Sequence, residues 1–394
     1  FYDNVLDTAF LLNAIPERYR KLGLSELDTY FAMARGYQGE KGDVKAFAMK
    51  KWFNTNYHYL VPEIDDNTNI KLSGNKPFEL FSEALENGIK TKPVIIGAYT
   101  FLKLARYTEN KTAVDFVDSI ILAYIEILKK FNNLSAEWVQ FDEPCLVMDM
   151  TDKDKELFVQ LYKRILSEKH NVKVLLQTYF GDVRDCYKEI CSLDFDGIGL
   201  DFVEGKKSLE LVKTNGFPAE KTLFAGVVNG KNIWKNNYSN TLSVVSELKK
   251  YTENIVINTS CSLLHVPYTL KNETKLSDSY KKHFAYAEEK LNELAELKKI
   301  LDSSNPAETD EYKKNSLLFK ESRSGANATV QNNISALSDK DFVRLPAFEE
   351  REEIQKDAFK LPFIPTTTIG SFPQTADERI ARASYRKGEI SEEK

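Results

Sequence analysis

The sequence is poor in cysteine and has no excess of positive charge. Four cysteines occur among 394 residues, Cys145, Cys186, Cys191 and Cys261, and no two have CxxC spacing. This excludes a dense disulfide framework and indicates a reducing, cytoplasmic compartment. The formal net charge is −5, so we expect no broad basic surface for nucleic acid or for a membrane. No apolar run approaches the roughly 20 residues of a membrane-spanning helix.

Several widespread motifs are also missing. No GxGxxG follows an apolar run, and neither a P-loop nor a GxSxG nucleophile elbow is present. The sequence therefore gives no sign of dinucleotide binding, of P-loop phosphate binding or of a serine hydrolase. The hydrophobic share of 42% is nevertheless ample for a large core, and the length fits one large domain or two.

What the sequence does contain is a series of short apolar runs separated by helix-like stretches. The runs are continuous rather than alternating, as in parallel strands that are buried on both faces. They begin near Lys92, Ala136, Val172, Phe195, Thr222 and Asn254. Steps of a few tens of residues are typical of repeated βα units. We predict an α/β fold, a (β/α)₈ TIM-type barrel whose first two strands would precede Phe1, with a doubly wound open sheet as the alternative.

The character of the sequence changes after Thr274. The stretch "LSDSYKKHFAYAEEKLNELAELKKILD" predicts one long amphipathic helix with Ser277 as its N-cap, and polar, charged sequence follows it. Next, "IPTTTIGSFPQT" (Ile364 to Thr375) predicts a strand that stops at a tight loop. Because the chain opens on "FYDN" without Met, we expect both ends to be incomplete. The predicted domains are a barrel over 1–273, a helical linker over 274–360, and the start of a second barrel over 361–394.

Two carboxylates stand side by side in "FDEP", at the end of a predicted strand. Adjacent strand residues point to opposite faces, so Asp142 and Glu143 can share the barrel mouth only if the strand has already ended. One of them could act as a base or accept a hydrogen bond from a ligand. The alternative is a capping or rim carboxylate with a structural role.

Two further stretches have residues that could bind a ligand. Cys261 and His265 in "NTSCSLLH" invite a zinc interpretation, but the other strand ends supply neither Cys nor His to complete a site. A buried thiol and a satisfied histidine are therefore favoured there. The segment "KKWFNTNYHYLVPE" is rich in aromatics and amides, and its Lys51 could meet an anion. Its alternative role is an aromatic plug at one end of the barrel.

Taken together and in this order, "KWFNTNYHYLVPE", "WVQFDEPCLV", "SCSLLH" and "LPFIPTTTIGSFPQT" resemble cobalamin-independent methionine synthase, and the opening "YDNVLDTAFLLNAIPERY" is similar to the same family. The resemblance covers essentially the whole chain. It implies two (β/α)₈ barrels, of which this chain holds most of the first, the linker and the first strand of the second. The implied reaction moves a methyl group from 5-methyltetrahydropteroyltri-L-glutamate to L-homocysteine, giving L-methionine.

The resemblance also implies roles for particular residues. Lys51 would contact the folate polyglutamate, and Ile369, Gly370 and Ser371 would contact homocysteine or methionine. The family's zinc ligands would lie outside this chain, in the missing part of the C-terminal barrel, and no cobalamin is used. Cys261 and Asp142 would be remnants of a duplication, as counterparts of a zinc-binding Cys and an amino-acid-binding Asp.

We therefore expect the N-terminal part of a cytoplasmic methyltransferase that is a monomer at full length and binds neither nucleic acid nor a membrane. The fragment alone is expected to be inactive. One rival is a non-catalytic folate-binding or scaffold barrel. The other is a barrel glycosidase that pairs Asp142 or Glu143 with Glu204 at a separation of about 5 to 10 Å.

Overall fold

The computed structural model describes residues 3–108, 110–320, 327–367, 370 and 373–393. The chain separates into two compact units, Phe1–Ser322 and Arg323–Lys394. Each unit is described by itself. The predicted boundaries at 273 and 360 stay a prediction.

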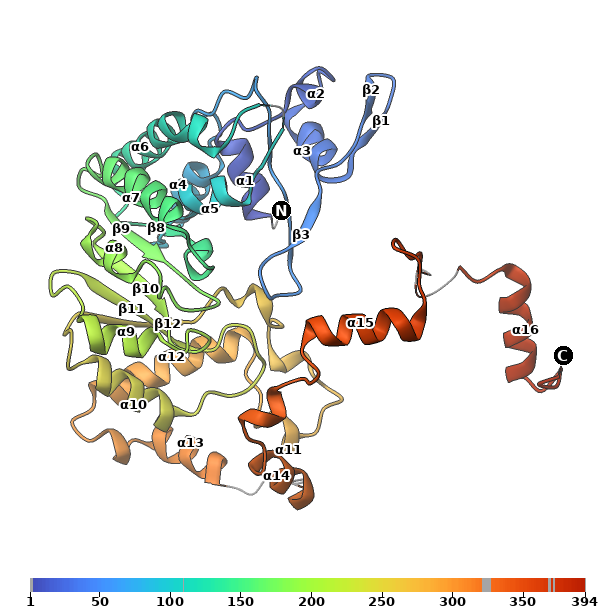
Figure 1. The fold of residues 1–394 in the computed structure, drawn as a ribbon. Helices are drawn as coiled ribbons and strands as arrows, with labels where there is room; N and C mark the ends of the chain where they lie inside the picture. Colours follow the sequence, from blue (N-terminus) through green and yellow to red (C-terminus); the bar gives the residue numbers. More distant parts are fainter. Residues whose placement is uncertain (1–2, 109, 321–326, 368–369, 371–372, 394) are drawn as a thin grey trace. The chain divides into compact units, whose positions relative to one another are not determined.

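A sheet of six parallel strands forms the centre of the first unit (Figure 1). In spatial order, which is also chain order, the strands are β6 (Val94–Ile96), β8 (Trp138–Asp142), β9 (Lys173–Gln177), β10 (Gly197–Asp201), β11 (Thr222–Val228) and β12 (Ile255–Thr259). Each begins within two residues of its predicted start. Consecutive parallel neighbours characterise a TIM-type barrel, whereas a doubly wound sheet reverses its order. The prediction of an α/β, TIM-type fold is confirmed, with six barrel strands among the described residues.

Helices follow the strands and cover the outer side of the sheet (Figure 1). They are α5 (Ala98–Leu104), α6 (Val117–Asn133), α7 (Asp152–Leu166), α8 (Tyr187–Ser192), α9 (Ser208–Asn215) and α10 (Tyr238–Leu248). Helix α6 shows why they dock, since Ile120, Tyr124 and Ile127 recur at helical spacing and are fully buried. Helix α7 begins at a capping box in which Thr151 and Asp154 satisfy each other's backbone N–H groups.

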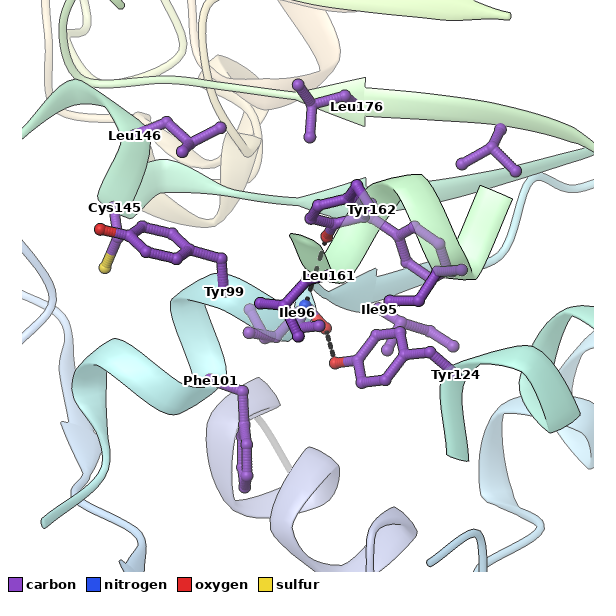
Figure 2. Packing of buried hydrophobic residues seen from close by; sticks show 14 of the residues in the cluster. Ile95, Ile96, Tyr99, Phe101, Tyr124, Cys145, Leu146, Leu161, Tyr162 and Leu176 are labelled. Atoms are coloured by element: carbon purple, nitrogen blue, oxygen red, sulfur yellow. Dashed lines mark hydrogen bonds between the residues drawn. The ribbon is translucent and has the colours of Figure 1, made fainter. Parts of the chain in front are cut away.

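The core lies between the sheet and these helices, and Figure 2 shows part of it. Tyr99, Tyr124 and Tyr162 are buried there among aliphatic side chains such as Ile95 and Leu176 (Figure 2). The Tyr124 hydroxyl donates to the carbonyl of Ile96, so the polar end of a buried ring is satisfied within the core.

The segment before β6 contains helices and two hairpins rather than barrel strands. Its elements are α1 (Asn4–Leu11), α2 (Glu17–Arg20), α3 (Glu26–Arg35), β1 (Tyr37–Gly39), β2 (Gly42–Val44), β3 (Met49–Lys51), β4 (His58–Leu60), β5 (Glu63–Ile64) and α4 (Lys76–Glu86), and β5 pairs with β7 (Arg106–Tyr107). Asp3 caps α1 by accepting from the backbone N–H groups of Val5 and Leu6. The same carboxylate accepts from the backbone N–H of Leu60 at 2.7 Å, which ties α1 to β4.

The prediction of one long helix from Leu276 to Asp302 is wrong. The structure has α11 (Asp278–Lys281) and α12 (Ala287–Asp302), and the residues between them pair with 233–235 through the Trp234–Phe284 bridge. Ser277 does occupy the N-cap of α11, but its side chain makes no capping hydrogen bond. Helix α12 packs through Leu297 and Ile300 against the barrel.

The remaining elements of the first unit are one α-helix and several short 3₁₀ helices. Helix α13 (Asp310–Lys320) follows α12. The 3₁₀ helices are η1 (Ala113–Phe116), η2 (Pro144–Val147), η3 (Leu263–His265), η4 (Leu270–Asn272) and η5 (Pro306–Glu308).

The second unit consists of helices joined by extended segments. They are α14 (Ala328–Ser335), η6 (Asp339–Phe342), α15 (Phe348–Phe359) and α16 (Ala376–Arg386). The prediction of a strand within "IPTTTIGSFPQT" is not met by its described residues, 364–367, 370 and 373–375, none of which is in a strand. A strand needs neighbours to satisfy its backbone groups, and the described part of this unit offers none.

No helix among the described residues of either unit has the length and the apolar content needed to cross a lipid bilayer.

Candidate functional site

Lys51 lies on a short hairpin formed by β3 and β4. The register pairs Lys51 with His58, Lys50 with Tyr59 and Met49 with Leu60. The Lys51 side chain is exposed, and among the described residues its ammonium group has no carboxylate partner. The hairpin therefore presents an unpaired positive charge to solvent.

The loop of this hairpin, residues 52–57, is closed by its own hydrogen bonds. The backbone N–H of Trp52 donates to the carbonyl of Tyr57 at 2.8 Å. Thr55 is buried, and its hydroxyl donates to the Trp52 carbonyl at 2.7 Å while accepting from the Tyr57 N–H at 3.1 Å. The Trp52 ring is buried against Phe53 and Tyr59. Thr55 and the backbone groups of the loop thus close the turn, and its aromatic rings pack against one another.

The loop contacts residues that follow four barrel strands. The Phe53 ring packs at a tilt against that of Phe180, after β9, with centroids 5.7 Å apart, and the Tyr57 ring meets that of His265, after β12, edge to face at 6.4 Å. Asn54 bonds to side chains that follow β10 and β11. The carboxyl ends of parallel strands form the mouth of a barrel, where TIM-type proteins hold their ligands. The hairpin therefore covers the mouth.

Two cavities adjoin Asp142. The smaller, of about 40 Å³, lies against Trp52, Tyr57, Tyr179 and His265 and is large enough for water only. The larger, of about 600 Å³, runs beside β6 and is lined by residues of α1, α3 and α4. Its size is in the range of small-molecule pockets, but Lys51 does not line it.

Asp142 points into the barrel from the end of β8. Its carboxylate accepts from Gln140 Nε2 at 2.7 Å and from the Tyr179 hydroxyl at 3.1 Å. Burial raises the pKa of Asp142 to about 6, although both hydrogen bonds oppose that shift. With this pKa, Asp142 could exchange a proton near neutral pH, as the predicted acid or base role requires. Its hydrogen bonds to Gln140 and Tyr179 are, however, also those of a carboxylate with a structural role.

Glu143 points the other way and caps a helix. It is fully buried and accepts from the backbone N–H groups of Tyr99 at 2.9 Å and Thr100 at 2.7 Å, in the first turn of α5, and from the Tyr162 hydroxyl. Burial raises its pKa to about 7. Asp142 and Glu143 therefore do not share a face, and the capping interpretation describes Glu143.

Cys261 and His265 do not assemble a metal site. Burial raises the pKa of the Cys261 thiol to about 12, and burial followed by the charge of Lys231 lowers the pKa of His265. Among the described residues, no group of three His, Cys, Asp or Glu side chains could hold a metal ion. The donors described in this chain do not fit the tetrahedral zinc that the family resemblance implies.

Of the three residues predicted to contact homocysteine, the structure describes Gly370. Ile369 and Ser371 are outside the described residues. Gly370 is exposed and has a φ of +60°, which a glycine adopts without strain. Gly370 is thus free to let a ligand approach its backbone, and the roles of all three residues stay predictions.

Sequence reasoning missed the residues that join the hairpin to the barrel. Asn54, Phe180 and Lys231 were not singled out, and Glu204 was considered only as an acid in a glycosidase. The signal was available, because Phe180, Glu204 and Lys231 each follow within a few residues of a predicted strand end. The sequence could not show that Asn54 bonds to Lys231, since the two residues are 177 positions apart in the chain.

Comparisons with known proteins agree on one family. The model of the cobalamin-independent synthase N-terminal domain matches residues 1–253, and that of the cobalamin-independent synthase catalytic domain matches residues 364–394. The 5-methyltetrahydropteroyltriglutamate–homocysteine methyltransferase of Streptococcus thermophilus is 53% identical over 392 residues, which is 100% of this chain and 51% of that protein. The protein of that name from Lactococcus lactis subsp. cremoris is 53% identical over 391 residues, 99% of this chain and 51% of the relative. The chain thus spans about half the length of these curated relatives.

Solved structures give a weaker likeness. A putative vitamin-B12 independent methionine synthase from Listeria monocytogenes has a TM-score of 0.47 at 13% identity and covers 61% of this chain and 74% of its own. A B12-independent methionine synthase from Shewanella, in complex with selenomethionine, has a TM-score of 0.47 at 15% identity, over 64% and 74%. The assignment rests on the sequence matches, since the N-terminal domain model alone covers more than half of the residues. The chain belongs to the cobalamin-independent methionine synthase family.

Proposed function

We propose that this chain is the N-terminal part of an enzyme that transfers the methyl group of 5-methyltetrahydropteroyltri-L-glutamate to L-homocysteine, giving L-methionine. The observation that carries the proposal is the 53% identity to proteins of that name along the entire chain. Its substrates are homocysteine and the methylfolate, and its partner is the remainder of the C-terminal barrel. The full-length protein acts as a cytoplasmic monomer.

In this proposal, Lys51 binds the polyglutamate tail. A triglutamate carries several carboxylates, and an ammonium group without a carboxylate partner attracts them as a point charge. The hairpin is closed by internal hydrogen bonds, so Lys51 loses little backbone freedom when it binds. Ile369, Gly370 and Ser371 contact the amino-acid substrate once the second barrel is present.

The proposal assigns no metal to this chain. The thiol of Cys261 is buried and hard to ionise, and the described residues supply no third ligand beside it. Zinc belongs to the C-terminal barrel of the full-length protein. The 394-residue chain is therefore expected to bind the methylfolate without forming methionine.

Calorimetric titration of this chain with 5-methyltetrahydropteroyltri-L-glutamate and with the monoglutamate tests the proposal. Lys51→Ala should weaken binding of the triglutamate by about fivefold and leave the monoglutamate unchanged. Lys50→Ala is the matched control, because the neighbouring strand residue points to the opposite face. Equal affinity of Lys51→Ala and the unmodified chain for the triglutamate would remove the assigned role.

A second measurement distinguishes part of a methyltransferase from a non-catalytic folate-binding barrel. The chain is incubated with both substrates and zinc, and methionine is quantified. Methionine formed by the chain alone would overturn its expected inactivity. Methionine formed only after addition of the separately produced second barrel would support the proposal, whereas folate binding without turnover in either case would favour a non-catalytic folate-binding barrel.

A further inference from the structure

Three side chains form a closed polar triangle between the hairpin and the barrel mouth. Lys231 Nζ lies 2.5 Å from Glu204 Oε1 and 2.7 Å from its Oε2. Asn54 Nδ2 donates to Glu204 Oε2 at 3.0 Å, and Lys231 Nζ donates to Asn54 Oδ1 at 2.9 Å. The amide thus serves both members of the ion pair at once. We call these three residues the clasp.

The barrel side of the clasp is held by one buried carboxylate. Asp201, at the end of β10, accepts from the backbone N–H groups of Val203 and Glu204 at 2.8 and 2.9 Å through Oδ1. Its Oδ2 accepts from the N–H of Phe180 at 3.0 Å. The backbones of Glu204 and Phe180 are therefore held by the same group, and the Lys231 ammonium lies 5.3 Å from the centroid of the Phe180 ring.

The two residues whose rings meet, Phe53 and Phe180, both have a strained backbone. Phe53 has a φ of +52° and Phe180 a φ of +72°, a region that bulky residues rarely adopt. Such conformations persist only where the surroundings over-determine them, and they gather at functional sites. The clasp and the contact between the two rings lie next to both of these residues in the chain or in space.

We propose that Asn54, Glu204 and Lys231 are positioning residues, which hold the hairpin closed over the barrel mouth and so fix Lys51 where the anionic tail of the substrate lies. The inference rests on the proposed role of Lys51. None of the three needs to touch the folate. Because Glu204 neutralises Lys231, the clasp also keeps a second cation from competing for the tail.

The amide of Asn54 makes the proposal testable by a charge swap. An amide has a donor and an acceptor, so rotating it by half a turn lets it serve a swapped pair. Glu204→Lys and Lys231→Glu should each open the hairpin, because each single change places two like charges in contact. The double variant restores an attractive pair that Asn54 can still bridge.

Two readouts are measured on the folded 394-residue chain. The first is the rate of tryptic cleavage after Lys51, which reports hairpin opening without any ligand. The second is the affinity for the triglutamate relative to the monoglutamate. Each single variant should raise the cleavage rate about tenfold and lower the triglutamate affinity about fivefold, with monoglutamate binding unchanged. The double variant should return both values to within about twofold of the unmodified chain.

Lys103→Met is the matched control, because Lys103 forms an ion pair of similar length with Asp154, between α5 and α7 and away from the hairpin. Its counterpart in the clasp is Lys231→Met, which removes the same charge and should raise the cleavage rate at Lys51, whereas Lys103→Met should leave that rate unchanged. A general loss of stability would act equally in both places, so equal cleavage at Lys51 in the two variants would overturn the inference. Failure of the double variant to rescue either readout would overturn it too. If Lys51→Ala has normal triglutamate affinity, the proposed function of Lys51 fails, while the cleavage rates still decide whether the clasp closes the hairpin.

Discussion

At the scale of single residues, Asp142 and Glu143 show how neighbours with the same chemistry acquire different roles. The alternation of a strand sends one carboxylate into the barrel and the other toward the first turn of α5. The sequence left open whether they would diverge, because adjacent residues point to opposite faces only where the strand has not yet ended. It could not predict which one would cap a helix, because the helix N-terminus at Tyr99 and Thr100 is more than forty residues away in the chain.

The capping carboxylate predicts a pH dependence of stability. In the folded protein the pKa of Glu143 is raised by burial from 4.5 to about 7, so the folded state keeps a proton that the unfolded state releases. Its contribution to the free energy of unfolding is therefore fully present below about pH 4.5 and is lost as the pH rises to about 7. Glu143→Gln should flatten this part of the pH profile of urea unfolding.

Below about pH 4.5 the same substitution should lower stability by about 1 to 3 kcal/mol, because an amide N–H replaces one acceptor facing the helix N–H groups, and the difference should shrink as the pH rises to about 7. Glu137→Gln is the control, since its exposed side chain precedes the same strand. An unchanged pH slope in Glu143→Gln would show that Glu143 is not the titrating group.

At the scale of elements, the strands were predictable and the helices after them less so. A continuous apolar run identifies a strand buried on both faces, and all six runs are strands of the central sheet. The predicted long helix failed because residues 283–285 pair with 233–235, a contact that local periodicity does not contain. The clasp could not be predicted either, because Asn54 bonds to residues that are 150 and 177 positions away in the chain. In the barrel the type of each strand therefore follows from local sequence, whereas breaks in helices and the strand expected within 364–375 depend on partners that are distant in the chain.

Helix α12 offers a test of whether the segment assigned to the linker belongs energetically to the barrel. Leu297 is fully buried against Val228 and Tyr238, whereas Leu291 of the same helix is 56% exposed. Leu297→Ala should lower the free energy of unfolding by about 2 to 5 kcal/mol, and Leu291→Ala by less than about 0.5 kcal/mol. Chemical denaturation followed by circular dichroism measures both. Equal effects would mean that α12 is not docked as described.

At the scale of the whole molecule, the sheet has two open edges among the described residues. Each of β6 and β12 pairs with a single neighbour, and Val94 of β6 is 50% exposed beside the larger cavity. Unpaired edges with apolar side chains are templates for pairing with another chain. We therefore expect this chain to self-associate when it is produced alone.

A charge on the open edge should counter that association. Val94→Lys should lower the weight-average mass in sedimentation and slow the growth of light scattering on concentration. Val114→Lys is the control, because Val114 is 73% exposed but lies in η1 and not on a sheet edge. A monodisperse unmodified chain, or an equal benefit from both variants, would show that the β6 edge does not drive association.

The burial of Trp52 gives the molecule a built-in optical probe. The chain has three tryptophans: Trp52 is buried within the loop of the hairpin, Trp138 is half-buried at the start of β8, and Trp234 is exposed. Opening of the hairpin would move Trp52 from packed aromatic surroundings into water and shift its emission to longer wavelength, while the other two rings keep their environments. With Trp138 and Trp234 replaced by Phe, the remaining fluorescence would follow the hairpin in real time, without any attached dye.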